Sequence, residues 1–274
     1  MEKELLRKVQ LTQLEIAKEI KRVCDDNNIS YFLTFGTLLG SIRHRGFIPW
    51  DDDMDIGMLR EDYDRFCEIA PKKLSSEYVF QTWENDDRYA LPFGKVRKKN
   101  TRYIESKSDM TSYNGFFVDI FPFDNAPSDL EIRKRLKKEL CNIERMMLMK
   151  CRYKPWITEN SKVNFKKRIG YIYYQIKSKF FSRKKLIEEY MKKVRSVQES
   201  NAIYDQSGNM HTKYFEKVWM KTTRIEKFED NDFKVPINAE KVLHVFYNNY
   251  MELPPENQRE NRHMIIEVDF GNEE

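Results

Sequence analysis

The sequence of 274 residues contains no apolar run that approaches the roughly 20 residues needed to cross a bilayer. Residues 1–4 are largely charged, and we expect them to open an amphipathic helix rather than a secretory signal. Cysteine is scarce as well: Cys24, Cys67, Cys141 and Cys151 show neither Cys-x-x-Cys nor Cys/His zinc spacing. These absences argue against a transmembrane protein, a disulfide framework and a zinc finger. They favour a cytoplasmic protein with reduced thiols.

Glycine and proline are also few, with nine of each scattered along the chain, and we find no Gly/Ser-rich linker and no internal repeat. The parts of the chain are therefore expected to pack together instead of moving as tethered modules. A composition of 40% hydrophobic and 14% aromatic residues supplies a sizeable core and argues against disorder. The length favours one elaborated domain, or one domain with a helical subdomain.

The formal net charge is +5, which would suit an anionic partner such as a nucleotide, a phospholipid surface or a nucleic acid. Most of this surplus comes from residues 133–195, whereas the first third of the chain is not basic. No signature of an RNA-binding module is visible in the sequence.

What the sequence does have is a dense carboxylate cluster at residues 51–55, set between apolar residues. Two unit charges about 4 Å apart repel by roughly 4 kcal/mol at an effective dielectric near 20, so a partly buried cluster needs cations or protons. If these residues form a strand, Asp51, Asp53 and Asp55 project from one face while Asp52 and Met54 take the other. That face would hold hard cations.

An apolar, aromatic stretch lies just upstream, at residues 31–35, and predicts a strand that ends in a turn at Gly36-Thr37. A glycine leaves the backbone open to a phosphate, and the Thr37 hydroxyl supplies one more donor. A lone Gly-Thr or Asp-x-Asp is usually only a turn or a cap. Strand, turn, short helix and Asp-Met-Asp together give the arrangement that metal-dependent nucleotidyl transfer requires, with Mg²⁺ clamped against the phosphate.

The segment 35–56, FGTLLGSIRHRGFIPWDDDMDI, is long and ungapped, and it resembles the LicD group of phosphocholine transferases, which is related to fukutin and fukutin-related protein. Similar segments follow at 93–97, 115–122 and 250–255, with His263 beyond them. The resemblance is weakest between about residues 133 and 209. It implies an α+β fold, with a nucleotidyltransferase-like mixed sheet flanked by helices and a basic helical insertion.

The chain is expected to divide into a catalytic core at 1–127, a helical basic section at 128–200 and a mixed segment at 201–274 that packs on the core. Apolar spacing predicts a first helix over 6–24, and Ser128-Asp129-Leu130-Glu131 has the form of a capping box that opens another. The remaining expected elements are a helix at 60–70 stopped by Pro71, strands at 78–83, 91–96 and 116–121, and two helices between 161 and 198.

Nucleotidyltransferase-like sites use a third acid from a neighbouring strand, and Asp119 is the one acid inside the apolar stretch 116–121. Burying it without a partner would be costly, so it is expected to be a metal ligand and a candidate base. The structural alternative is a salt bridge to a core arginine. Asp124, just past Pro122, is assigned by default to a turn or a cap.

Basic residues are the candidates for binding the nucleotide donor. Arg43 shares a helical stripe with Leu39 and is predicted to point inward, while His44 is either a local hydrogen-bond partner or a reactive group. The resemblance implies that Lys95 and Arg97 neutralise the diphosphate. On their own, basic residues at a strand edge commonly serve to prevent aggregation.

Three further residues stay without a firm assignment. Trp50 and Trp83 are interpreted as core rather than base-stacking residues. His263 lies where the family has a late histidine, and it either approaches the site or is structural.

The basic helical section admits two interpretations, because its lysines and arginines alternate with aromatic and aliphatic residues. The first is an amphipathic surface that rests on anionic lipid and meets a lipid-linked glycan. The second, which we favour from the sequence, is a helical pair with its aromatic stripe in the core and its lysines solvated. The apolar members are Phe165, Tyr171, Ile172, Tyr173, Tyr174, Ile176, Phe180 and Phe181.

The hypothesis that follows is transfer of phosphocholine, or a similar phospho-substituent, from a CDP-linked donor to a hydroxyl of a cell-surface glycan such as lipopolysaccharide or teichoic acid. Mg²⁺, with Mn²⁺ as an alternative, would be held by Asp51, Asp53, Asp55 and Asp119. Two alternatives remain open: a nucleotidyltransferase that leaves the nucleoside monophosphate on its acceptor, and a basic RNA- or membrane-binding protein with a degenerate site. We expect no nucleic-acid partner and a cytoplasmic location, with peripheral contact at the inner membrane face left open.

Overall fold

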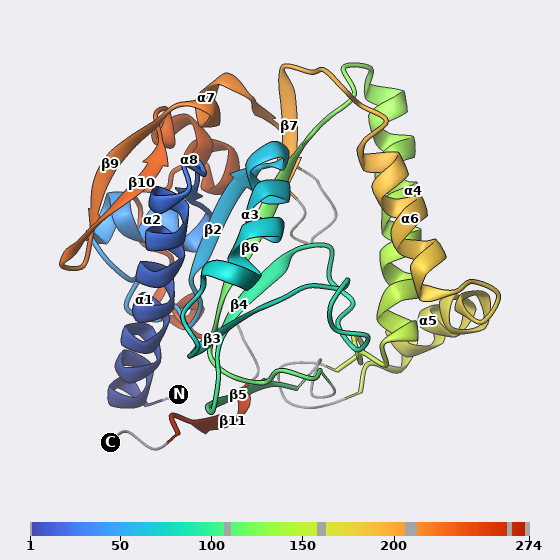
Figure 1. Cartoon of the computed structure of the whole chain (residues 1–274), viewed down its shortest axis with the longest axis horizontal. Helices are drawn as coiled ribbons and strands as arrows, with labels where there is room; N and C mark the ends of the chain where they lie inside the picture. The colour runs from blue at the N-terminus through green and yellow to red at the C-terminus, as the bar shows by residue number, and fades with distance from the viewer. Residues whose placement is uncertain (1, 107–110, 158–162, 206–212, 262–264, 272–274) are drawn as a thin grey trace.

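A mixed sheet runs through the computed structural model of the chain, which describes residues 2–106, 111–157, 163–205, 213–261 and 265–271 (Figure 1). The strand order is β1-β2-β6-β4-β3, and β7 and β8 extend the sheet from the end of β6. β2 and β6 are parallel, whereas β1 with β2, β4 with β6 and β3 with β4 are antiparallel. The sheet strands are β1 (Phe32–Leu33), β2 (Asp55–Leu59), β3 (Tyr78–Gln81), β4 (Gly94–Lys98), β6 (Phe117–Asn125), β7 (Ala202–Asp205) and β8 (Phe215–Glu216).

Helices flank this sheet, as expected for the α+β class. α1 packs against β4 and β6, and α3 packs against β2, β3 and β6. The helices are α1 (Lys3–Asp26), α2 (Phe35–His44), α3 (Arg60–Lys73), α4 (Leu130–Lys150), α5 (Phe165–Ser178), α6 (Arg183–Val194), α7 (Val218–Lys221), α8 (Ala239–Tyr247) and the 3₁₀ turn η1 (Glu256–Gln258). None of the helices in the described part of the chain is long and apolar enough to span a bilayer.

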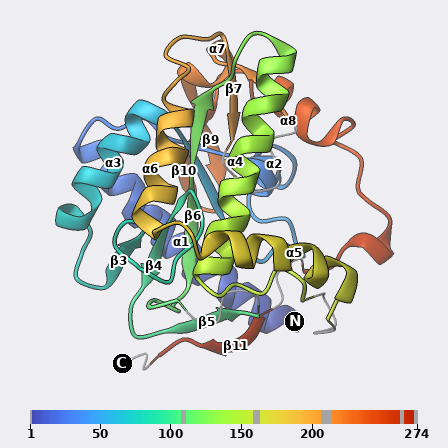
Figure 2. The same ribbon diagram turned by 90° about the vertical axis from the view of Figure 1, so that its right-hand side faces the viewer.

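Two small antiparallel sheets complete the described part of the fold. β9 (Thr223–Phe228) pairs with β10 (Asn231–Pro236), and β5 (Arg102–Glu105) pairs with β11 (Ile265–Asp269). The apolar side chains of the described residues form two cores: one around the large sheet, α1 and α8, and a second that joins α4 and α6 to the loop at 83–91. Figure 2 shows α4 and α6 side by side, with α5 at their lower end. The predicted boundaries at 127 and 200 stay a prediction.

Several predicted elements differ in their bounds. β1 covers only Phe32 and Leu33, because Phe35 already begins α2. α3 continues past Pro71, which falls in the last turn, and closes with the Leu74 N–H donating to the Ala70 carbonyl at 3.0 Å. The helix after Pro127 is capped by Asp129 rather than Ser128, since the Asp129 carboxylate accepts from the Ile132 amide at 2.8 Å. β5 and β11 have no counterpart among the predicted strands.

Candidate active site

A cavity of about 900 Å³ opens between α2, the loop that precedes β2, the strands β4 to β6 and the chain that follows α8. Its polar lining contains six carboxylates and two basic groups. The carboxylates are Asp51, Asp53, Asp55, Glu105 and Asp119, with a further Glu252 at the segment after α8. The basic groups are Arg43 and Lys95. We refer to this space as the acidic cavity.

The register of three strands brings its central residues together. Asp55 on β2 lies opposite Asp119 on the parallel strand β6, and Lys95 on the antiparallel strand β4 lies opposite Asp119 from the other side. The Lys95 ammonium is 2.7 Å from Asp119 Oδ1 and 3.6 Å from Glu105 Oε2, and it lies 3.3 Å from the centroid of the Phe117 ring. The structural alternative for Asp119 was a salt bridge to a core arginine. The structure has a salt bridge to Lys95 instead.

The surroundings of Asp119 change its acidity. Burial raises the pKa of the Asp119 carboxyl above its usual value, although the nearby Lys95 ammonium opposes that shift. The carboxylates Glu105 and Asp53 raise this pKa further. Asp119 therefore takes up a proton more readily than an exposed aspartate, which is the property a general base needs.

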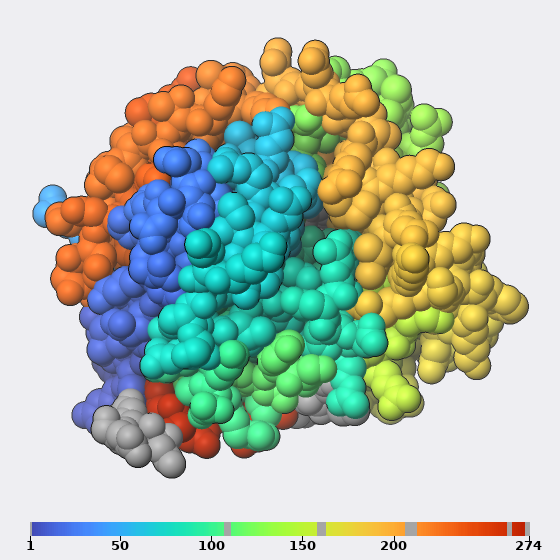
Figure 3. Space-filling model, viewed as in Figure 1, coloured from blue at the N-terminus to red at the C-terminus, as the bar shows by residue number. Residues whose placement is uncertain are grey.

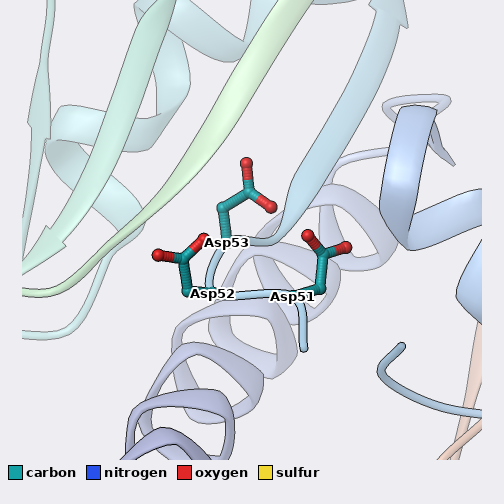
Figure 4. Close-up of side chains that lie close together, drawn as sticks. All are labelled: Asp51, Asp52 and Asp53. Atoms are coloured by element: carbon teal, nitrogen blue, oxygen red, sulfur yellow. The ribbon is translucent and has the colours of Figure 1, made fainter. Parts of the chain in front are cut away.

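The other acids come from the loop before β2. Asp51, Asp53 and Asp55 line the acidic cavity, whereas Asp52 is fully buried. Only Asp55 belongs to a strand, so the predicted strand over all of these residues is wrong for Asp51 to Met54. Figure 4 shows Asp51, Asp52 and Asp53 rising from this loop, and one carboxylate oxygen of each lies within 4.8 Å of the others.

Helix α1 and strand β5 hold the backbone of that loop. Gln10 Nε2 donates to the Asp51 carbonyl and Gln13 Nε2 to the Asp52 carbonyl, both at 2.9 Å. The Tyr103 hydroxyl donates to the same Asp52 carbonyl at 3.1 Å. The two glutamines are polar residues on the otherwise apolar buried face of α1. Polar residues at these positions of an apolar stripe are the feature of the sequence that could have indicated this contact with the loop.

These side chains suit a hard divalent cation. Carboxylate oxygens are the donors that Mg²⁺ and Mn²⁺ prefer, and a loop that presents alternate aspartates to one cavity can supply several of them. Asp51, Asp53, Asp55 and Asp119 all line the acidic cavity, whereas the carboxylate oxygens found within 4.8 Å of one another belong to Asp51, Asp52 and Asp53.

Gly36 and Thr37 lie in the first turn of α2 rather than in a loop. A Cβ on Gly36 would fall 2.6 Å from Asp51 Oδ2, so the open side of this glycine faces the carboxylate. The Thr37 hydroxyl accepts from the Asp55 amide at 2.8 Å, and Thr37 is not part of the cavity lining. Thr37 thus fixes the start of β2, and its predicted contact with a phosphate has no support in this geometry.

The N-terminus of α2 reaches the cavity through Phe35 and Gly36. Phe35 has a left-handed backbone with φ of 47°, and its ring packs edge-on against Phe121 and Phe246 with centroids 5.0 and 4.9 Å apart. Such a conformation costs about 1 to 3 kcal/mol, which the aromatic packing must offset. The helix dipole favours negative charge at this point of the cavity wall.

Arg43 points inward as predicted and lines the cavity. Its Nη1 donates to the Tyr250 carbonyl at 2.7 Å and to the Glu252 carbonyl at 3.1 Å, which ties α2 to the segment after α8. His44 packs edge-on against Trp50, and its pKa is lowered by partial burial and then by Arg43. His44 is therefore a neutral neighbour of the site near pH 7.

Arg97 is buried away from the cavity lining. Its Nη1 donates to the Gly115 carbonyl at 2.7 Å and its Nε to Gln81 Oε1 at 2.5 Å. It therefore braces the chain that leads into β6, and the geometry gives no support for a direct contact with a diphosphate. Lys95, two residues earlier on β4, does line the cavity.

Three further predictions from the sequence concern Asp124, the two tryptophans and His263. Asp124 is not a turn residue, because it lies in β6 and accepts from Arg60 Nε and Nη2 at 2.6 and 2.7 Å. Trp83 is core, as expected, whereas Trp50 lines the cavity. His263 lies outside the described residues.

Glu105 is a carboxylate of the cavity that was not predicted from the sequence. Glu105 is the last residue of β5, which is too short and too polar for its sequence to predict a strand. Its position in the site depends on the pairing of β5 with β11. The end of α8 and the chain after it, from Tyr247 to Pro255, were also not expected to form a wall of the site.

Fold and site together define a nucleotidyltransferase-like transferase. Residues 28–140 match the family described as LicD/FKTN/FKRP, nucleotidyltransferase domain, a range that contains every carboxylate of the predicted metal set. Residues 28–140 of this chain are therefore similar to the LicD nucleotidyltransferase domain.

Relatives similar to this chain include a bacterial and a mammalian transferase. Lipopolysaccharide cholinephosphotransferase LicD of Haemophilus influenzae is 29% identical over 266 residues, which is 96% of this chain and 98% of that protein. Ribitol 5-phosphate transferase FKRP is 42% identical over 109 residues in both its human and mouse forms. That match covers 40% of this chain but only 20% of the FKRP proteins, so it concerns a limited part of both.

Proposed function

We propose that this protein transfers a phospho-substituent, phosphocholine or a similar group, from a CDP-linked donor to a hydroxyl of a cell-surface glycan. The observation that carries the proposal is the convergence of Asp51, Asp53, Asp55 and Asp119 on one cavity beside Lys95. The similarity over nearly the full length of a cholinephosphotransferase supports phosphocholine, and the FKRP similarity makes a polyol phosphate the next candidate.

In this proposal the donor lies with its diphosphate between the N-terminus of α2, Arg43 and the acidic loop. The helix dipole and the guanidinium provide the positive potential, and the aromatic wall that includes Phe35 and Trp50 excludes water from the reacting phosphorus. The acceptor hydroxyl attacks in line. Asp119 accepts its proton as the new P–O bond forms, and CMP leaves with the electrons of the bond that breaks.

A divalent ion at this site, Mg²⁺ or Mn²⁺, would supply charge neutralisation at the diphosphate and at the departing CMP. Asp51, Asp53, Asp55 and Asp119 are the residues that would hold it. Lys95 balances part of the negative charge at Asp119, and Glu105 fixes the ammonium from the other side. The acceptor class would be a glycan such as lipopolysaccharide or teichoic acid, met from the cytoplasmic side.

The test is turnover of labelled CDP-choline with Asp53→Asn and Asp55→Asn. Each variant should lose metal-dependent release of CMP by about 100-fold or more, because a missing ligand removes charge stabilisation that acts in the transition state. Asp26→Asn, in an exposed turn of α1, is the matched control and should keep full turnover. Full activity in both site variants would contradict the metal assignment.

The description of the matched domain favours one second candidate, a conventional nucleotidyltransferase. The products separate the two. Free CMP with label on the glycan supports the proposed transfer, whereas nucleotide attached to the acceptor from CTP or CDP-choline supports the alternative.

A further inference from the structure

Helix α5 lies at the edge of the molecule, beyond α4 and α6 in Figure 1, and Figure 3 shows the surface of this part projecting at the right-hand side. One face of the helix rests on α4. There the Tyr174 hydroxyl accepts from Arg145 Nη1 at 2.8 Å and donates to Asn142 Oδ1 at 3.0 Å. Ser178, one turn further along the same face, is buried.

The opposite face is apolar and exposed. At about 100° per residue, its members fall within one stripe about 100° wide on the side of the helix away from Tyr174. They are Phe165, Ile169, Ile172, Tyr173, Ile176 and, just past the helix end, Phe180. Phe165 is 68% exposed, Ile169 65% and Phe180 81%. An apolar stripe of this length, about 22 Å, marks a surface that binds something. The stripe also shows that our favoured interpretation of this section, an aromatic stripe in the core, is wrong for these exposed residues, although Tyr174 packs against the second core as expected.

The charges beside the stripe are all of one sign. On the same helical wheel, Arg168 and Lys179 follow one flank of the stripe, and Lys166 and Lys177 follow the other. The sequence contains no aspartate or glutamate from residue 163 to residue 187. Lys184 and Lys185, at the start of α6, add exposed positive charge next to the end of α5.

We propose that α5 is an interfacial helix that lies in the headgroup layer of an anionic membrane. The apolar stripe enters the boundary of the acyl chains, and the basic residues on both flanks extend along the surface to the lipid phosphates. The charge pattern is what favours lipid over a protein groove. A protein partner would need acidic rows on both sides of an apolar trough, whereas an anionic bilayer offers both features at every point. This inference does not depend on the proposed reaction.

Vesicle co-sedimentation of the full chain tests it. The protein should bind vesicles that contain about 30% phosphatidylglycerol in phosphatidylcholine, bind pure phosphatidylcholine far less, and be released by high salt, because part of the attraction is screened. Ile169→Gln/Ile176→Gln should lower the partition coefficient by roughly tenfold or more, since both side chains are expected to insert. Leu130→Gln/Ile132→Gln on α4, where exposure is 63% and 48%, is the matched control and should bind like the wild type.

A charge variant tests the contribution of the basic residues to membrane binding. Arg168→Gln/Lys179→Gln should reduce binding to the anionic vesicles by roughly 30-fold and leave the weak binding to phosphatidylcholine unchanged. Because all these side chains are on the surface, the circular dichroism and thermal unfolding of each variant should match the wild type. Equal binding to both kinds of vesicle, or wild-type binding by either α5 variant, overturns the proposal. So does a wild-type dimer that becomes monomeric in the isoleucine variant without any vesicle binding, since a second copy would then cover the stripe.

Discussion

Gly36 shows how a single missing Cβ shapes the acidic cavity. In Gly36→Ala the new methyl group would fall 2.6 Å from Asp51 Oδ2, so this carboxylate must turn away while the helix stays in place. We expect kcat/KM for the donor to fall by roughly tenfold to a hundredfold, because a displacement of about 1 Å at a reacting centre has that effect. Steady-state kinetics at saturating Mg²⁺ provide the measurement.

Gly170 provides the control for that substitution. It lies in α5, where an added Cβ would meet no neighbouring atom within 4 Å, so Gly170→Ala should leave turnover unchanged and raise stability by about 0.5 to 1 kcal/mol. If Gly36→Ala keeps wild-type kinetics, Asp51 is not held in a position that the reaction uses.

Asp86 is expected to give the fold a specific sensitivity to acid. Burial alone would raise the pKa of this carboxyl, but hydrogen bonds from the Arg88 amide, the Gln81 side chain and Ser112 outweigh it and lower the pKa. A lowered pKa in the folded state stabilises the fold above the unfolded value of about 3.9, and this stabilisation is lost as pH falls through the folded value.

Asp86→Asn should therefore reduce the free energy of unfolding by about 1 to 3 kcal/mol at pH 7, and this difference should shrink as pH falls from about 5 to 3. Urea unfolding of both proteins at each pH measures it. A difference that stays constant or grows toward acid would contradict the assigned sign.

Single residues also show which parts of the site can be predicted from the sequence. Asp51, Asp53, Asp55 and Asp119 were found because acids flanked by apolar residues are costly to bury, and that cost is local to the sequence. The role of Arg97 was not predictable, because it depends on Gly115 and Gln81, which only the sheet register brings to its side.

At the scale of elements, one ion pair fastens α3 to β6. Arg60, the first residue of α3, donates to both oxygens of Asp124, whose side chain is 2% exposed. Arg60→Met would leave a buried carboxylate without this partner and should cost about 3 to 5 kcal/mol of stability.

The double variant Arg60→Met/Asp124→Leu removes both charges and should recover most of that loss, since two apolar side chains of similar volume can replace a buried pair. Denaturant unfolding of the two single variants and the double variant forms the cycle. Strict additivity of the two losses would show that the pair is not coupled.

Elements with strong periodicity were predicted well and short ones were not. The apolar stripe of α1 and the pair α5 and α6 follow from spacing alone. β5 and β11 are five residues or fewer and gain their stability from pairing across more than 150 positions, which no local pattern records. The exposed stripe of α5 has the same periodicity as a buried one, so the sequence could not tell which side of the helix meets solvent.

For the whole molecule, ligand binding should appear as added thermal stability. If Mg²⁺ binds the folded chain and not the unfolded one, a concentration 100 times its dissociation constant adds about 2.7 kcal/mol. Thermal unfolding should shift upward with MgCl₂ and return with EDTA. Asp55→Asn should show a smaller shift, and KCl at equal ionic strength should show none.

The position of Lys95 beside Asp119 bears on how stable the protein is when no metal ion is bound. Small zinc domains cannot fold until their ion arrives, because metal binding supplies most of their folding free energy. Here the Lys95 ammonium lies 2.7 Å from Asp119, so the protein itself supplies a positive charge beside this carboxylate before any ion binds. If the proposed reaction needs Mg²⁺, a cell short of magnesium would keep a folded, inactive protein that regains turnover when magnesium returns, instead of losing it to proteases.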